Sequence, residues 1–209
     1  TSKTFDNATS CSSENSLVIL DEVYENAVEA LQKEGGVLLD HEETQELKNN
    51  LWIQGKLNPH LIAKSASEIA SAVGLHRTQM KTAKMLMVEE TGTGIKYPFS
   101  GEKLSPVLTI YREDNFETAC QKIIELYEFQ GKGHSVGLHS KDETRPLEMG
   151  LKIPACRVIV NQPHCLATGG SFGNGMPFSL SMGCGTWGKN SISDNLNYRH
   201  FLNIVRVVH

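Results

Sequence analysis

Cys11 is the residue whose surroundings best suit it to act as a nucleophile. It lies in a run of small polar residues, Asn7-Ala8-Thr9-Ser10-Cys11-Ser12-Ser13-Glu14, whereas Cys120 and Cys156 lie within apolar stripes. Small neighbours leave the sulfur accessible. We also expect a loop-to-helix junction here, where backbone N–H groups and the helix dipole lower a thiol pKa and can donate to an oxyanion. From the residues alone, Cys11 is either a reactive thiol or an inert cysteine.

Other patterns in the sequence are weaker. Cys165 stands beside His164, but we expect a strand there, and adjacent residues of a strand point to opposite faces. The segment Gly183-Cys184-Gly185-Thr186-Trp187-Gly188 matches GxGxxG without the preceding strand, following helix and later acidic residue that a dinucleotide site requires. The eight histidines show no metal-ligand spacing, so we expect no metal site.

The elements that must position these residues alternate between strands and helices, which is typical of an α/β fold. Apolar, β-rich runs predict strands over residues 16–20, 37–39, 85–88, 107–111, 134–138 and 157–160. Helical periodicity predicts helices over residues 24–34, 42–51, 61–73, 115–127 and 142–149. Residues 201–208 alternate enough to form an edge or exchanged strand. Seven of the 18 glycines lie between Gly169 and Gly188, where we expect a long functional loop.

Composition narrows the class of protein. The 209 residues are 39% hydrophobic, enough for one packed domain over residues 1–209. The net charge is −4 and the basic residues are scattered, so no nucleic-acid partner is expected. No run is apolar enough for a membrane span, no signal peptide is visible, and the five cysteines include no CxxC pair, which together predict a cytoplasmic protein. The chain begins without Met, which suggests a fragment.

Four segments, in order along the chain, resemble the thiol-bearing half of the aldehyde dehydrogenase superfamily, and more narrowly its CoA-acylating branch. They are Lys3-Thr4-Phe5-Asp6-Asn7, Cys11-Ser12-Ser13-Glu14-Asn15-Ser16, Gly101-Glu102-Lys103-Leu104-Ser105-Pro106-Val107 and Met182-Gly183-Cys184-Gly185-Thr186-Trp187-Gly188-Lys189-Asn190-Ser191. The closing segment, residues 169–204, looks most like acylating sulfoacetaldehyde dehydrogenases. The branch also includes the aldehyde dehydrogenase portion of bifunctional aldehyde-alcohol dehydrogenases.

The resemblance implies a fold and a chemistry. The fold would be the family's catalytic domain, a mostly parallel twisted sheet flanked by helices, with a C-terminal strand that joins subunits into a homo-oligomer. Cys11 would attack an aldehyde, hydride would pass to NAD or NADP, and coenzyme A would take the acyl group from the resulting thioester. Glu102 would bind the nicotinamide ribose and Leu104 would border it, although Glu102 could also be a solvated loop carboxylate.

The same resemblance implies which residues bind the substrate and which domain of the family this sequence lacks. Donor or cationic groups for an anionic aldehyde such as sulfoacetaldehyde are expected in the closing segments, where the candidate substrate-binding residues are His164, Phe172, Arg199 and His200, with Lys189 nearby. In the family, the dinucleotide-binding domain precedes the catalytic cysteine, outside this sequence, so the chain alone is expected to be inactive. The alternatives are a hydrolytic semialdehyde dehydrogenase and a non-catalytic oligomerisation domain of the same fold.

Overall fold

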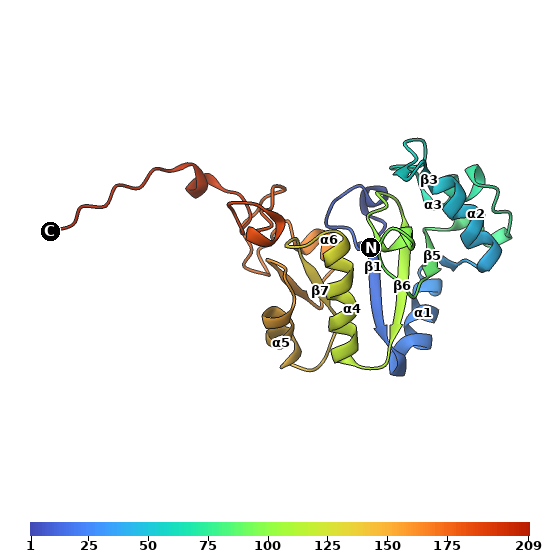
Figure 1. The fold of residues 1–209 in the computed structure, drawn as a ribbon, viewed down its shortest axis with the longest axis horizontal. Helices are drawn as coiled ribbons and strands as arrows, with labels where there is room; N and C mark the ends of the chain where they lie inside the picture. The colour runs from blue at the N-terminus through green and yellow to red at the C-terminus, as the bar shows by residue number, and fades with distance from the viewer.

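The main sheet of the protein consists of four parallel strands. A computed structural model describes all residues 1–209 (Figure 1). The strands β1 (Ser16–Leu20), β2 (Gly36–Leu38), β5 (Met85–Glu89) and β6 (Val107–Glu113) lie in the order β1-β6-β5-β2. A second parallel sheet pairs β7 (Val136–Leu138) with β8 (Val158–Val160), and β3 (Trp52–Ile53) pairs antiparallel with β4 (Lys56–Leu57). The predicted α/β class with a mostly parallel sheet is confirmed.

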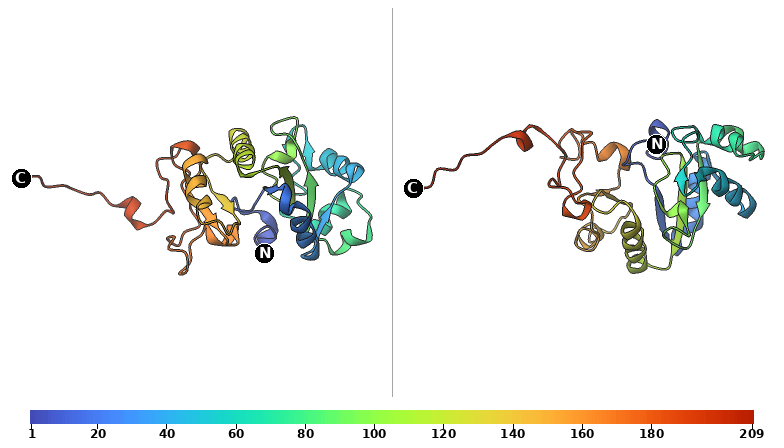
Figure 2. Two further views of the ribbon diagram at one scale, coloured as in Figure 1. Left: turned by 90° about the horizontal axis from the view of Figure 1, so that it is seen from below. Right: turned by 45° about the horizontal axis from the view of Figure 1, so that its top comes forward.

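Helices cover both faces of the main sheet, because its strands carry apolar side chains on both sides. On β5, Met85 and Met87 pack with α1 (Tyr24–Lys33), whereas Leu86 and Val88 face the larger cluster built with α2 (His41–Leu51) and α3 (Ala66–Ala72). Figure 2 shows the sheet between these helices. The alternation of side chains along β5 therefore divides the core into two clusters, one on each face.

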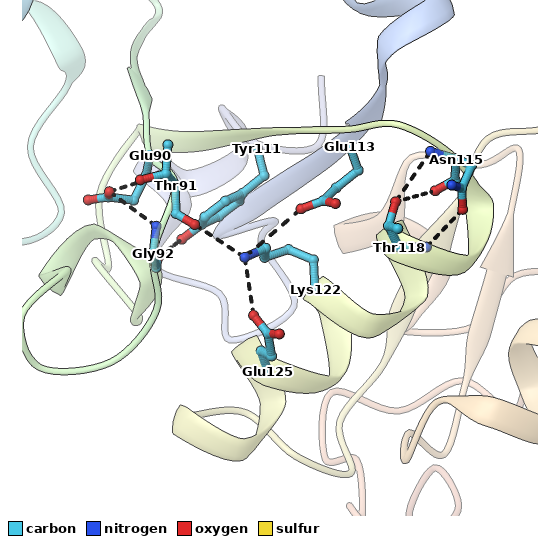
Figure 3. Close-up of polar contacts among 9 residues, drawn as sticks. All are labelled: Glu90, Thr91, Gly92, Tyr111, Glu113, Asn115, Thr118, Lys122 and Glu125. Carbon is cyan, nitrogen blue, oxygen red and sulfur yellow. Dashed lines mark hydrogen bonds and ion pairs between the residues drawn. The ribbon is translucent and has the colours of Figure 1, made fainter.

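Helix α4 (Phe116–Phe129) joins the two sheets (Figure 1). Its apolar side packs on β7 together with α5 (Arg145–Lys152). Figure 3 shows its polar attachment to the main sheet: Lys122 Nζ donates to the Thr91 carbonyl at 3.2 Å, lies 3.9 Å from Glu113 and stands over the Tyr111 ring. The helix begins where Asn115 Oδ1 accepts two backbone N–H groups.

Some predicted elements have other boundaries. The helix predicted over residues 61–73 begins only at Ala66, because Ala63 has a positive φ of 61° and the Ser65 side chain caps the first turn. The strand predicted over residues 201–208 is not formed within this chain: residues 202–209 pair with no strand and extend away from the body (Figure 1). Residues 169–188 form a loop, as predicted. No helix combines the length and the apolar character needed to cross a membrane.

Candidate active site

Cys11 lies in a tight turn, and residues 12–15 connect it to β1. The backbone N–H of Ser13 donates to the Ser10 carbonyl at 2.9 Å, and the Ser10 and Ser12 hydroxyls are 3.0 Å apart. Cys11 itself is exposed, whereas Ser12 and Ser13 are buried. The predicted loop-to-helix junction is wrong, because the turn leads into a strand rather than a helix. No helix dipole therefore acts on the Cys11 thiol.

The structure places an imidazole next to this thiol. His134 Nε2 lies 3.3 Å from Cys11 Sγ, although 123 positions separate the two residues in the sequence. Both residues stand just before a parallel strand, Cys11 before β1 and His134 before β7. No sequence pattern singled out His134; its place as the first residue of a predicted strand is the only signal that could have found it. A thiol and an imidazole at this distance can exchange a proton.

A hydrogen-bonded chain continues behind His134. His134 Nδ1 lies 2.6 Å from Ser135 Oγ, which in turn lies 2.8 Å from His164 Nε2. His164 is buried and belongs to helix α6 (His164–Ala167), not to the strand that we predicted. The neighbouring Cys165 is also buried, and its backbone N–H donates to Ser2 Oγ at 2.7 Å.

Electrostatics favour the neutral forms of the thiol and the imidazole. Partial burial, and after it the Glu102 carboxylate, raise the pKa of Cys11, and only the residue's own N–H acts strongly in the other direction. The expected lowering of this thiol pKa is therefore wrong. Burial, the Arg157 guanidinium and His164 lower the pKa of His134 to about 4. At neutral pH, His134 is thus an uncharged group with one free acceptor nitrogen.

Glu102 and Leu104 lie in a segment whose burial alternates from residue to residue. Between them Lys103 is fully buried and donates to the Phe99 and Gly101 carbonyls at 2.6 and 2.8 Å. Glu102 and Leu104 are both half-buried. The Glu102 backbone N–H donates to Gln130 Oε1 at 2.8 Å, but its carboxylate takes part in no hydrogen bond or ion pair. Because this carboxylate also influences the Cys11 pKa, it is a free acceptor near the thiol.

Arg157 fastens the glycine-rich loop to the segment that carries His134. Its buried guanidinium donates to Asn195 Oδ1 at 2.9 Å, to the Gly183 carbonyl at 2.9 Å and to the His134 carbonyl at 3.2 Å. Gly133 has a φ of 91°, and a Cβ there would lie 2.2 Å from the Cys184 carbonyl oxygen. The GxGxxG-like segment is therefore a packing surface for the residues before His134.

The remaining candidates are not brought to the thiol. Phe172 is fully exposed and packs edge-on against Phe178, with ring centroids 5.0 Å apart. Arg199 is exposed, and His200 Nδ1 accepts the Asn197 backbone N–H at 3.0 Å. None of these three side chains contacts Cys11, His134 or Glu102, so their binding roles stay predictions. No three His, Cys, Asp or Glu side chains are grouped so that they could hold a metal ion.

Comparison with known proteins gives a consistent family. The chain is 55% identical over 206 residues to an acylating sulfoacetaldehyde dehydrogenase from Cupriavidus necator, covering 99% of this chain and 42% of that protein. It is 36% identical to an acetylating succinate-semialdehyde dehydrogenase from Clostridium kluyveri, covering 99% and 45%. The crystal structure of an acetylating aldehyde dehydrogenase from Geobacillus thermoglucosidasius superimposes with a TM-score of 0.91 at 36% identity, covering 100% and 45%.

These matches cover nearly all of this chain but only part of each relative. No family model matches the chain. The chain spans less than half the length of each of these relatives. Within that span, the alignments and the superposition cover essentially every residue of the chain. Over its whole length, the chain is similar to the corresponding part of acylating members of the aldehyde dehydrogenase superfamily.

Proposed function

We propose that the protein containing this chain oxidises a short aldehyde to its acyl-CoA with NAD or NADP, and that Cys11 is the nucleophile. The observation that carries the proposal is the 3.3 Å contact between Cys11 Sγ and His134 Nε2. The name of the 55% identical relative makes sulfoacetaldehyde the first candidate substrate, and other short aldehydes such as acetaldehyde come next. The name of the 36% identical relative supports the same acyl-transfer chemistry.

Formation of the first covalent bond uses two groups of this chain. The sulfur forms a bond to the carbonyl carbon while its proton passes to His134 Nε2, and the π electron pair moves to the oxygen. The Cys11 backbone N–H donates to no carbonyl of the chain, so it is available for the oxyanion. The product of this step is the oxyanion of a thiohemiacetal on Cys11, and the proton rests on His134.

The residues near the thiol suit a nicotinamide cofactor. The half-buried Glu102 carboxylate has no hydrogen-bond partner, so it is available to accept hydrogen bonds from ribose hydroxyls. Leu104, two residues further on and also half-buried, offers an apolar side chain. The bound nicotinamide supplies the hydride acceptor. After the thiohemiacetal is oxidised to a thioester and His134 Nε2 releases the Cys11 proton to solvent, the same nitrogen takes the proton of the coenzyme A thiol and returns it to the Cys11 sulfur that this thiol displaces.

The complete enzyme would also need a cofactor domain, contacts between subunits and groups that bind the tail of the substrate. We place the dinucleotide-binding domain in the remaining length of the longer protein, with residues 1–209 as the thiol-bearing catalytic domain. A homo-oligomer would form through residues 201–208, whose apolar side chains are exposed. His164 Nε2 is occupied by Ser135 and His200 Nδ1 by the Asn197 N–H, so among the substrate candidates the exposed Arg199 guanidinium is the group that we expect to meet an anionic tail, with His200 Nε2 beside it.

The test is a product assay on the full-length protein. Sulfoacetaldehyde, coenzyme A and NAD or NADP are supplied, and both reduced cofactor and acyl-CoA are measured. Cys11→Ser should abolish both products, whereas Cys120→Ala, in the buried core of α4, should keep them. Free acid formed without any need for coenzyme A would show a hydrolytic semialdehyde dehydrogenase instead. The absence of cofactor reduction with any short aldehyde would show a non-catalytic domain.

A further inference from the structure

Behind His134, a hydrogen-bonded chain runs through Ser135 to His164. What we infer from it rests on the proposed role of Cys11 as the nucleophile. Ser135 Oγ stands between two imidazoles, 2.6 Å from His134 Nδ1 and 2.8 Å from His164 Nε2. Only 6% of His164 is exposed, so its contact with Ser135 lies in the interior of the protein, where the packing around it holds the ring in place. The strand beside it leaves room for the ring: a Cβ at Gly137 of β7 would lie 2.9 Å from His164 Nδ1.

The number of hydrogens on each group determines which group donates in each hydrogen bond between Cys11 and His164. A neutral imidazole carries one N–H, so His134 can accept the Cys11 proton at Nε2 only if its own hydrogen sits on Nδ1. Ser135 Oγ then accepts that hydrogen and donates its own to His164 Nε2. His164 must in turn carry its hydrogen on Nδ1, a buried atom that has no hydrogen-bond partner in this chain. In the opposite direction, His134 Nε2 would present a hydrogen to the sulfur and could not act as a base.

The charges around the two histidines differ. The Arg157 guanidinium donates a hydrogen bond to the His134 carbonyl, and its charge disfavours a second positive charge on the His134 ring. The other titratable neighbours of His134 are Cys11 and His164. Burial lowers the pKa of His164, the Glu14 carboxylate, whose Oε2 is buried without a hydrogen-bond partner, raises it, and His139 lowers it. Burial lowers the pKa of both rings, but only His164 has a carboxylate that raises it. A carboxylate therefore favours a proton on His164, and none does so on His134.

We propose that Ser135 and His164 are positioning residues that form a proton relay for His134. When Cys11 loses its proton, the S–H bond breaks and a bond to His134 Nε2 forms. The hydrogen on His134 Nδ1 passes to Ser135 Oγ, and the Ser135 hydroxyl hydrogen passes to His164 Nε2. His134 ends neutral, and the positive charge rests on His164 beside Glu14. The relay thus maintains a minor population of Cys11 thiolate whose positive counterpart is His164.

The test measures thiol reactivity without aldehyde or cofactor. The rate of Cys11 alkylation by iodoacetamide is followed against pH in the full-length protein, with the modified cysteine identified by mass spectrometry. With the relay, the wild-type rate keeps a plateau below the thiol's own titration, because an ion pair formed by internal proton transfer does not depend on pH. Ser135→Ala should lower that plateau at least about tenfold, and Ser135→Thr, which keeps a hydroxyl, should restore it.

A second variant separates the relay from simple packing. His164→Gln keeps an acceptor of similar reach for Ser135 but cannot take a proton, so it should lose the plateau while its melting temperature stays near that of the wild type. A wild-type profile in His164→Gln, or in Ser135→Ala, would overturn the relay. If His134→Ala also leaves the profile unchanged, the proposed role of the thiol and imidazole pair fails too, which distinguishes the two failures.

Discussion

Lys3 offers a sharp test of how burial controls charge in this fold. The side chain is only 7% exposed, and burial lowers its pKa from the ordinary 10.5 to about 7, against the opposing carboxylates of Glu14 and Glu102. Since each unit of pKa is worth about 1.4 kcal/mol, the charged form costs the folded state at most about 5 kcal/mol. Lys3→Met keeps the stem of the side chain and removes this cost.

The sign of the pH dependence follows from proton counts. Between about pH 7 and about pH 10.5 the unfolded chain holds the Lys3 proton and the folded chain does not, so the free energy of unfolding rises with pH. Below about pH 7 both states hold the proton, and the full cost remains. The advantage of Lys3→Met should therefore be largest at about pH 6 and fall by about 1.4 kcal/mol per pH unit above pH 7.

Urea unfolding across this pH range, followed by circular dichroism, measures the difference directly. The exposed lysine Lys141 provides the matched control, and Lys141→Met should change the free energy of unfolding equally little at every pH. If wild type and Lys3→Met showed parallel curves from pH 6 to about pH 10, the folded protein would keep Lys3 charged throughout. The argument from burial would then be refuted.

Three further substitutions test the positioning of the site. Asn115→Ala removes the acceptor for two N–H groups at the start of α4 and should lower the free energy of unfolding by about 0.5–2 kcal/mol in urea; no change would show that the cap is dispensable. Arg157→Met frees the glycine-rich loop from the His134 carbonyl, so limited proteolysis within residues 169–188 should accelerate and Cys11 alkylation should slow; unchanged cleavage would contradict this link. Leu86→Ala in the fully buried core should cost about 2–5 kcal/mol, whereas Leu147→Ala, 71% exposed, should cost under about 0.5 kcal/mol.

Local patterns predicted the main sheet well. The strands β1, β5 and β6 are continuous apolar runs, and α1 and α4 follow helical periodicity, so short-range spacing suffices to find them. Boundaries shifted where a single side chain decides them, as Ser65 does for α3. The short helix at His164 was mistaken for a strand because four residues carry too little periodicity to separate the two.

The site was predictable only in part. Cys11 stood out through its small polar neighbours and the resemblance of its motif to the family. His134, Ser135 and Arg157 did not, because their roles depend on how the β7–β8 sheet docks beside the main sheet. That docking is set by the apolar side of α4 against β7 and by the buried contacts of Arg157, none of which has a signature in local spacing.

The placement of the thiol and the imidazole also says something about folding order. Because 123 positions separate Cys11 from His134, their contact closes a loop that contains the whole main sheet and α4. Contacts of such long sequence separation form after the local ones in most folding reactions. The reactivity of Cys11 should thus emerge late during refolding, after helix content has recovered, and a simple thiol reagent would report the moment at which the two sheets reach their native arrangement.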